Sequence, residues 1–118
     1  DQPAESVKMV PDRMTVAEFA RFPDRKNFEL IDGVLRERPG GAKAGYVGGR
    51  ALFALMNDPR TEAAGLAAVA GLGFCCFPGR SDTVCRSRGA LVSVAKLTPA
   101  DWHAEFCPVA PELVIEAV

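Results

Sequence analysis

The sequence has almost no excess of charge of either sign. Its 118 residues include fourteen Lys and Arg and fifteen Asp and Glu, which gives a formal net charge of -1. This balance argues against a protein that coats nucleic acid through a global positive field, so a nucleic-acid site would have to be a local patch. Arg80, Arg86 and Arg88 form a local run of basic residues, and such a run is typical of a solvated surface.

The chain also lacks a long hydrophobic run. Its longest apolar stretch, residues 64–77, is shorter than the ~20 residues that a membrane-spanning helix needs. The first residues do not contain the apolar segment of a signal peptide. We therefore expect a cytoplasmic protein with no membrane partner, in which residues 1–13 are a polar leader and residues 14–118 form a single domain.

Metal-binding side chains are scarce as well. The chain has one histidine, and its four cysteines include no Cys-x-x-Cys pair. This spacing argues against a zinc site, and in a reducing compartment we expect small, buried thiols instead. Cys75 and Cys76 are adjacent and would point to opposite faces of a strand. A Cys75–Cys85 bridge stays open as an alternative in one hairpin register.

The clearest local signal that is present predicts a β-hairpin at residues 28–37. Asp32-Gly33 is a strong signal for a two-residue turn, because both central positions of a type I′ turn need a positive φ. With that turn, Glu29 lies opposite Arg36. The structural interpretation of Glu29 is therefore an exposed cross-strand ion pair, worth ~0.2–1 kcal/mol.

Capping and turn residues divide the rest of the chain into short elements. Thr15 and Thr98 are expected N-caps, the glycine-rich residues 38–49 are expected to be loop, and Trp102 is expected to be a core or rim aromatic rather than a base-stacking platform. The expected elements are, in chain order, a helix at 14–23, the hairpin at 28–37, a helix within 50–60 that Asp58-Pro59 ends, short strands from residue 64, a short helix within 97–106 and a strand at 111–118. This order predicts an α/β or α+β domain in which helices pack on a mixed sheet.

Glu116 is the acidic residue whose position most suggests chemistry. It lies near the end of a Val- and Ile-rich strand that we expect to be buried on both faces. A buried carboxylate costs several kcal/mol unless it is paired or binds a metal. The alternative is that the end of this strand is frayed and that Glu116 is hydrated.

Several of these segments together resemble a known family. The stretches "MTVAEFARFP", "FELIDGVLRE", "GFCCFPGRSDTVCRSRGALVSVAKL" and "APELVIEAV" are similar to the Uma-type family of endonucleases, within the PD-(D/E)XK restriction-endonuclease-like superfamily. The resemblance covers residues 14–118, and "ELIDG" and "PELVIE" are its sharpest parts. It implies a restriction-endonuclease-like mixed sheet flanked by helices.

The resemblance also implies a magnesium site. In that superfamily an aspartate and a glutamate on neighbouring strands bind Mg²⁺, and a lysine orients or activates the attacking water. Mg²⁺ is held by one or two carboxylates together with water and phosphate oxygens, and it polarises the phosphoryl group. Carried over by motif, Glu29 and Glu116 are the expected catalytic and metal-binding residues, and DNA is the expected substrate.

The sequence departs from the family pattern at the expected site. Arg88 stands where the family has its aspartate and Ser87 where it has a proline, and Ala44 lies near the place of a family histidine. A permanent positive charge would repel Mg²⁺, so we expect Arg88 to pair with Glu116 or Glu29. Asp82 is the nearest acid in sequence that could replace the aspartate. The chain also ends before the family's lysine, which leaves the expected fold incomplete at its C-terminus.

Three functions follow, and the third is from a different class. The first is a Mg²⁺-dependent DNA endonuclease. Arg88 argues against this activity, because its positive charge would repel Mg²⁺. The alternative is a catalytically inactive nuclease-fold module for binding or interaction, with no cofactor. The third is a stand-alone interaction domain whose exposed sheet edge, at the last strand, recruits a partner and would allow a homodimer.

Overall fold

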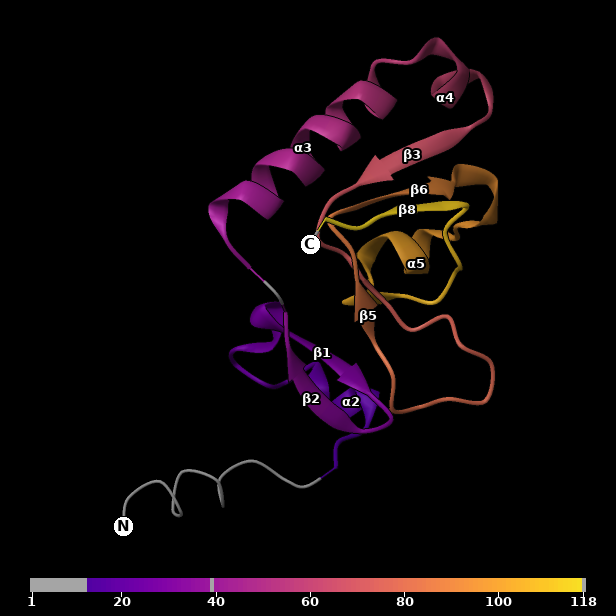
Figure 1. Ribbon diagram of the computed structural model, residues 1–118. Coiled ribbons are helices and arrows are strands. Elements are labelled where there is room, and N and C mark those ends of the chain that lie inside the picture. The colour runs from indigo at the N-terminus through magenta and orange to yellow at the C-terminus, as the bar shows by residue number, and fades with distance from the viewer. Residues whose placement is uncertain (1–12, 39, 118) are drawn as a thin grey trace.

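The computed structural model describes residues 13–38 and 40–117 (Figure 1). Of the predicted polar leader, all but Arg13 lies outside the described residues. The described chain folds into short helices and three small sheets, which confirms the α/β class. Where one mixed sheet was expected, a two-stranded hairpin, an antiparallel sheet in the order β3-β6-β8 and a mixed sheet in the order β5-β4-β7 are found. The restriction-endonuclease-like arrangement stays a prediction.

The first elements form as their sequence signals predict. Thr15 caps α2 (Val16–Phe19) with a complete capping box. Strands β1 (Phe28–Ile31) and β2 (Val34–Glu37) pair in the expected register. Asp32 and Gly33 join them with φ angles of 52° and 82°, as a type I′ turn requires. The remaining elements are η1 (Arg25–Asn27), α3 (Ala42–Met56), α4 (Pro59–Ala63), β3 (Leu66–Val69), β4 (Gly73–Phe74), β5 (Cys85–Arg86), β6 (Gly89–Ser93), η2 (Val94–Lys96), α5 (Pro99–His103), β7 (Phe106–Cys107) and β8 (Leu113–Ile115).

Helix α3 begins much earlier than expected. Residues 42–49 are helical, so the prediction of a glycine-rich loop through residue 49 was wrong. Glycine weakens an isolated helix, but here it permits close packing. A Cβ atom at Gly48 would lie only 2.7 Å from the Cβ of Arg88. Contact with the rest of the protein therefore outweighs the local propensity.

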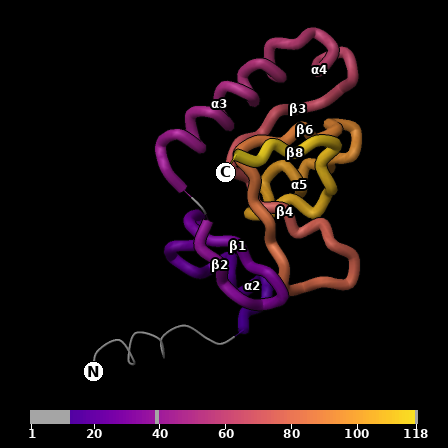
Figure 2. Tube along the Cα trace, viewed as in Figure 1, coloured from indigo at the N-terminus to yellow at the C-terminus, as the bar shows by residue number. Residues whose placement is uncertain are grey.

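The elements lie in layers on either side of the two three-stranded sheets. Helix α3 packs against β3, β6 and β8, and the tube in Figure 2 shows it running along that sheet. The opposite face of β6 contributes Ala90 and Val92 to a core cluster that includes Phe74 and Cys107. A second core cluster lies between the mixed sheet and the N-terminal elements; it contains Met14, Phe19, Leu30, Val84 and Phe106.

The cysteines follow the predicted strand geometry but form no bridge. Cys75 packs against one core cluster and Cys76 against the other, which confirms that they point to opposite faces. All four cysteines are free thiols. A Cys75–Cys85 bridge is therefore wrong, because Cys85 stands opposite Phe74 in the ladder.

Strand β8 contradicts the expectation of a strand buried on both faces. It lies at the edge of its sheet, and Leu113 and Val114 are 42% and 50% exposed. Because the strand is an edge, Glu116 just after it is exposed as well. The exposure of Glu116 agrees with the alternative in which this side chain is hydrated, and it excludes a buried carboxylate.

Among residues 13–38 and 40–117, no helix has the length and apolar character that a membrane span requires.

Candidate functional site

The structure brings Glu29 and Glu116 into one small pocket. This pocket, which we call the glutamate pocket, has a volume of about 90 Å³. Its lining residues are Glu29, Arg38, Arg86, Arg88, Glu116 and Ala117. The segment from Arg86 to Arg88 connects the two acids, since it contacts β1 on one side and β8 on the other. The Arg88 backbone N–H donates to the carbonyl of Ile115 at 2.9 Å, the residue before Glu116.

Glu29 is held by the backbone rather than by its cross-strand neighbour. Glu29 and Arg36 are partners in the hairpin register, as predicted. The Glu29 carboxylate, however, accepts a hydrogen bond from the Arg86 backbone N–H at 2.6 Å. In the described part of the chain no ion pair joins Glu29 to Arg36, so that expectation was wrong. The half-buried carboxylate instead connects β1 to β5.

Arg86 is an interior residue, although its sequence neighbourhood is typical of a solvated surface. It is 8% exposed, and its guanidinium donates to the carbonyls of Phe28, Gly71 and Arg25 at 3.0, 3.1 and 3.2 Å. The same group lies 5.8 Å and 5.6 Å from the ring centroids of Phe19 and Phe106. Burial lowers the pKa of Arg86. The three carbonyls show that Arg86 supports the fold.

The electrostatics of the glutamate pocket are dominated by arginine. Three arginines and two glutamates are among the residues that line it. Arg38 is anchored by a hydrogen bond of 3.3 Å from Nη2 to the Ser87 carbonyl. Burial raises the pKa of the neighbouring Cys85 thiol, and the charges of Glu29 and Glu116 raise it further. The structure thus places Arg88 beside both acids, in the pocket where the family pattern has an aspartate.

The residues of the glutamate pocket do not fit Mg²⁺. Within the described ranges, no group of three or more His, Cys, Asp or Glu side chains is placed to hold a metal. Asp82 does not line the pocket; it forms an ion pair with Arg80 at 3.5 Å, and its carbonyl accepts from Gly33. The permanent positive charges of the arginines that line the same pocket oppose the approach of a divalent cation.

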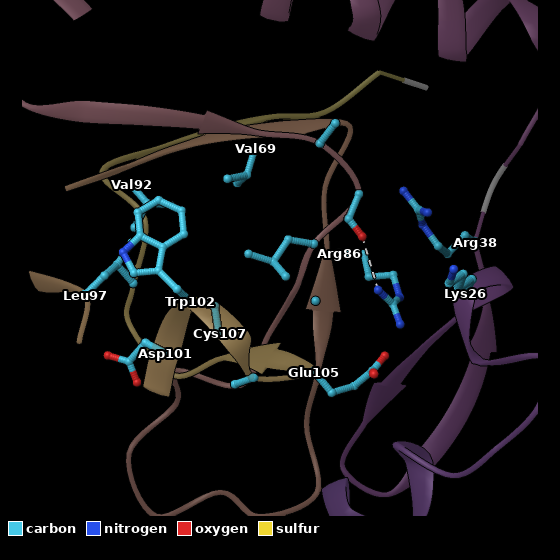
Figure 3. A pocket seen from close by; sticks show the side chains of 15 residues that line it. Lys26, Arg38, Val69, Arg86, Val92, Leu97, Asp101, Trp102, Glu105 and Cys107 are labelled. Carbon is cyan, nitrogen blue, oxygen red and sulfur yellow. Dashed lines mark hydrogen bonds between the residues drawn. The ribbon is translucent and has the colours of Figure 1, made fainter. Parts of the chain in front are cut away.

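A larger cavity adjoins the glutamate pocket and shares Arg38 and Arg86 with it. This cavity, which we call the Trp102 cavity, has a volume of about 690 Å³. Figure 3 shows Trp102, Leu97 and Val92 at one end, and Arg86, Arg38, Lys26 and Glu105 at the other. The Trp102 side chain is 52% exposed, so it is a rim aromatic. No sequence signal marks this cavity, because its walls come from distant segments.

A third recess adjoins the other two. It shares Lys26 and Arg38 with the Trp102 cavity, and Arg38 and Arg88 with the glutamate pocket. It has a volume of about 330 Å³ and is lined by Asp24, Lys26, Asn27, Glu37, Arg38, Gly40 and Arg88. We call it the rim recess. Arg38 therefore lines all three of these hollows.

No family model, curated protein or solved structure matches this chain. The resemblance to the Uma-type endonucleases therefore stays a prediction.

Proposed function

We propose that this protein is a catalytically inactive, nuclease-like module that binds the phosphate backbone of nucleic acid. The observation that carries the proposal is that Arg38 and Arg88 line both the glutamate pocket and the adjoining rim recess. Their permanent positive charges favour an anion over a divalent cation. Arginine is suited to this role because its planar guanidinium can donate two parallel hydrogen bonds to a phosphate.

The basic residues form the local patch that a nearly neutral protein would need. Lys26, Arg38 and Arg88 line the rim recess, and Arg38 extends the patch into the glutamate pocket. Asp24 and Glu37 lie in the same recess, so the positive surface is narrow. A narrow patch supports contact with a few phosphates rather than broad coating of a duplex.

Binding of fluorescently labelled DNA oligonucleotides, followed by anisotropy in EDTA over a series of salt concentrations, tests this proposal. Arg38→Ala is expected to weaken binding about tenfold and to lower the salt slope by about 0.7–0.9, the value for one lost phosphate contact. Arg50→Ala is the matched control: Arg50 is exposed on α3, lies over the Tyr46 ring and is absent from the described linings of the three recesses. It should change the affinity less than twofold. Absence of salt-dependent binding, or equal effects of the two variants, would overturn the proposal.

A second candidate function is Mg²⁺-dependent endonuclease activity. It is favoured by one observation, that Glu29 and Glu116 line the same pocket, as the resemblance implies. This function requires cleavage of plasmid DNA with Mg²⁺ or Mn²⁺ and its loss in Glu116→Gln. Arg88→Asp would restore the family's acid, so a gain of metal binding in this variant would mean that the scaffold can still form the site.

Two further expectations belong to this proposal. A cytoplasmic location suits the four free thiols. A homodimer through the exposed edge strand β8 predicts a mass that increases with concentration in analytical ultracentrifugation, and a monomer at all concentrations would exclude it.

A further inference from the structure

We propose that the Trp102 cavity receives the base of an unstacked nucleotide whose phosphate lies at Lys26 and Arg38, so that the module prefers single-stranded over duplex nucleic acid. This inference rests on the proposed function and names the form of nucleic acid that would be bound. The volume of about 690 Å³ lies within the range of small-molecule sites, which are mostly apolar with a few polar groups.

The apolar end of the cavity offers a flat surface for a planar ring. Trp102 lies on α5 with about half of its side chain exposed, and Leu72, Val92 and Leu97 line the same space. Base stacking on an aromatic side chain contributes about tenfold or more to affinity and tolerates any base. The exposed indole was expected to be structural, but its position in the cavity wall makes it a stacking platform.

Charge at the two ends would orient the ligand. Glu105, at the positive end, forms an ion pair with Arg25 at 2.9 Å, and the Arg25 hydrogen bond lowers the pKa of Glu105. Its negative charge is thus balanced, whereas Lys26 and Arg38 add positive charge beside it. Asp101 lies at the Trp102 end and would repel a phosphate there. A nucleotide is therefore expected to place its base at Trp102 and its phosphate near Arg38.

The same arrangement explains the preference for a single strand. Bases in a duplex are stacked and paired, so they cannot enter a cavity without unstacking. A single strand can turn one base into the Trp102 cavity while neighbouring phosphates follow Arg38 into the rim recess and the glutamate pocket. A free nucleoside monophosphate shares the base and phosphate chemistry, and the experiment separates the two sources.

The chain contains one tryptophan, so its fluorescence reports on this cavity alone. The full chain is titrated with a single-stranded oligonucleotide, with the same oligonucleotide made fully abasic, with the matching duplex and with adenosine monophosphate. The base-bearing single strand should quench Trp102 fluorescence and bind at least fivefold more tightly than the abasic strand or the duplex. The Trp102 variants contain no tryptophan, so their affinities are measured by the anisotropy of labelled strands. Trp102→Ala should remove the advantage over the abasic strand, while Trp102→Phe should keep most of it.

The outcomes separate this inference from the proposed function. If the base-bearing and abasic strands bind equally and Arg38→Ala weakens both, backbone binding stands and the base cavity is overturned. If neither strand binds at low salt, the proposed function fails. Quenching by adenosine monophosphate without binding of any strand would overturn the single-strand preference and assign the cavity to free nucleotides. Trp102→Phe keeps the test valid should Trp102→Ala fail to fold.

Discussion

The glutamate pocket and the Trp102 cavity share Arg38 and Arg86 but differ in the rest of their walls. The glutamate pocket is lined almost wholly by charged side chains, and one of its carboxylates already accepts from the backbone at 2.6 Å. The Trp102 cavity is apolar at one end and charged at the other. A charged residue that lines a pocket can thus serve the fold, as Arg86 does, and the apolar end of the Trp102 cavity offers a ligand contacts that the glutamate pocket lacks.

The largest effect on the free energy of unfolding is expected from replacing Arg86, which lines both the glutamate pocket and the Trp102 cavity. Arg86→Met should lower the free energy of unfolding by about 3 kcal/mol or more, because Arg86 is buried and three partly buried carbonyls would lose a charged donor. Arg38→Met is the matched control, with a half-buried side chain and one hydrogen bond to a carbonyl, and should cost less than about 1.5 kcal/mol. Urea unfolding measures both. Equal losses of stability in the two variants would contradict the conclusion that Arg86 supports the fold.

A smaller effect on the free energy of unfolding is expected where Gly48 of α3 packs against Arg88, which lines the glutamate pocket. Gly48→Ala would bring a Cβ atom to 2.7 Å from the Arg88 Cβ, and overpacking of this kind costs about 1–3 kcal/mol. Gly49→Ala is the matched control, because nothing lies within 4 Å of its Cβ position. It should stabilise the helix by up to about 1 kcal/mol. Thermal unfolding of the two variants should therefore shift in opposite directions, and shifts of the same sign would refute the close packing.

The smallest effect is a pH dependence of the melting temperature. It arises from Glu112, which lies just before strand β8. The Glu112 carboxylate accepts from Lys96 Nζ at 2.6 Å and from the Ser93 N–H at 2.8 Å, and these bonds lower its pKa. Because the folded pKa is depressed, the stabilisation is complete above the ordinary glutamate pKa and is lost as pH falls through the folded value. The difference in melting temperature between the wild type and Glu112→Gln should therefore be largest near neutral pH and shrink in acid. A difference that is independent of pH would exclude this role for Glu112.

Local sequence signals predicted the local structure of this protein well. The capping box at Thr15, the N-cap at Thr98 and the turn at Asp32-Gly33 all form as expected, because each depends on residues within a few positions. Register then followed from the turn, so the pairing of Glu29 with Arg36 was also predicted.

Features that depend on distant contacts were not predicted. Helix α3 contains residues 42–49 because Gly48 lets it approach Arg88. Arg86 is buried because carbonyls from three other segments converge on it. No periodicity along one segment carries that information.

The candidate site was predicted only in part. The resemblance named Glu29 and Glu116, and these residues share a pocket, but their strand environments differ from the expected ones. Glu29 is tied to a backbone N–H and Glu116 is exposed after an edge strand. The Trp102 cavity was missed because α5, β6 and the segment between β3 and β4 form it together.

If the glutamate pocket binds phosphate without a metal ion, Mg²⁺ should not be needed for binding. The affinity for a labelled single-stranded oligonucleotide is measured in EDTA and in excess Mg²⁺, and the length of the strand is checked afterwards. Similar affinities and an intact strand are expected in both solutions. Binding that requires Mg²⁺, or strand breaks that Glu116→Gln removes, would contradict this expectation.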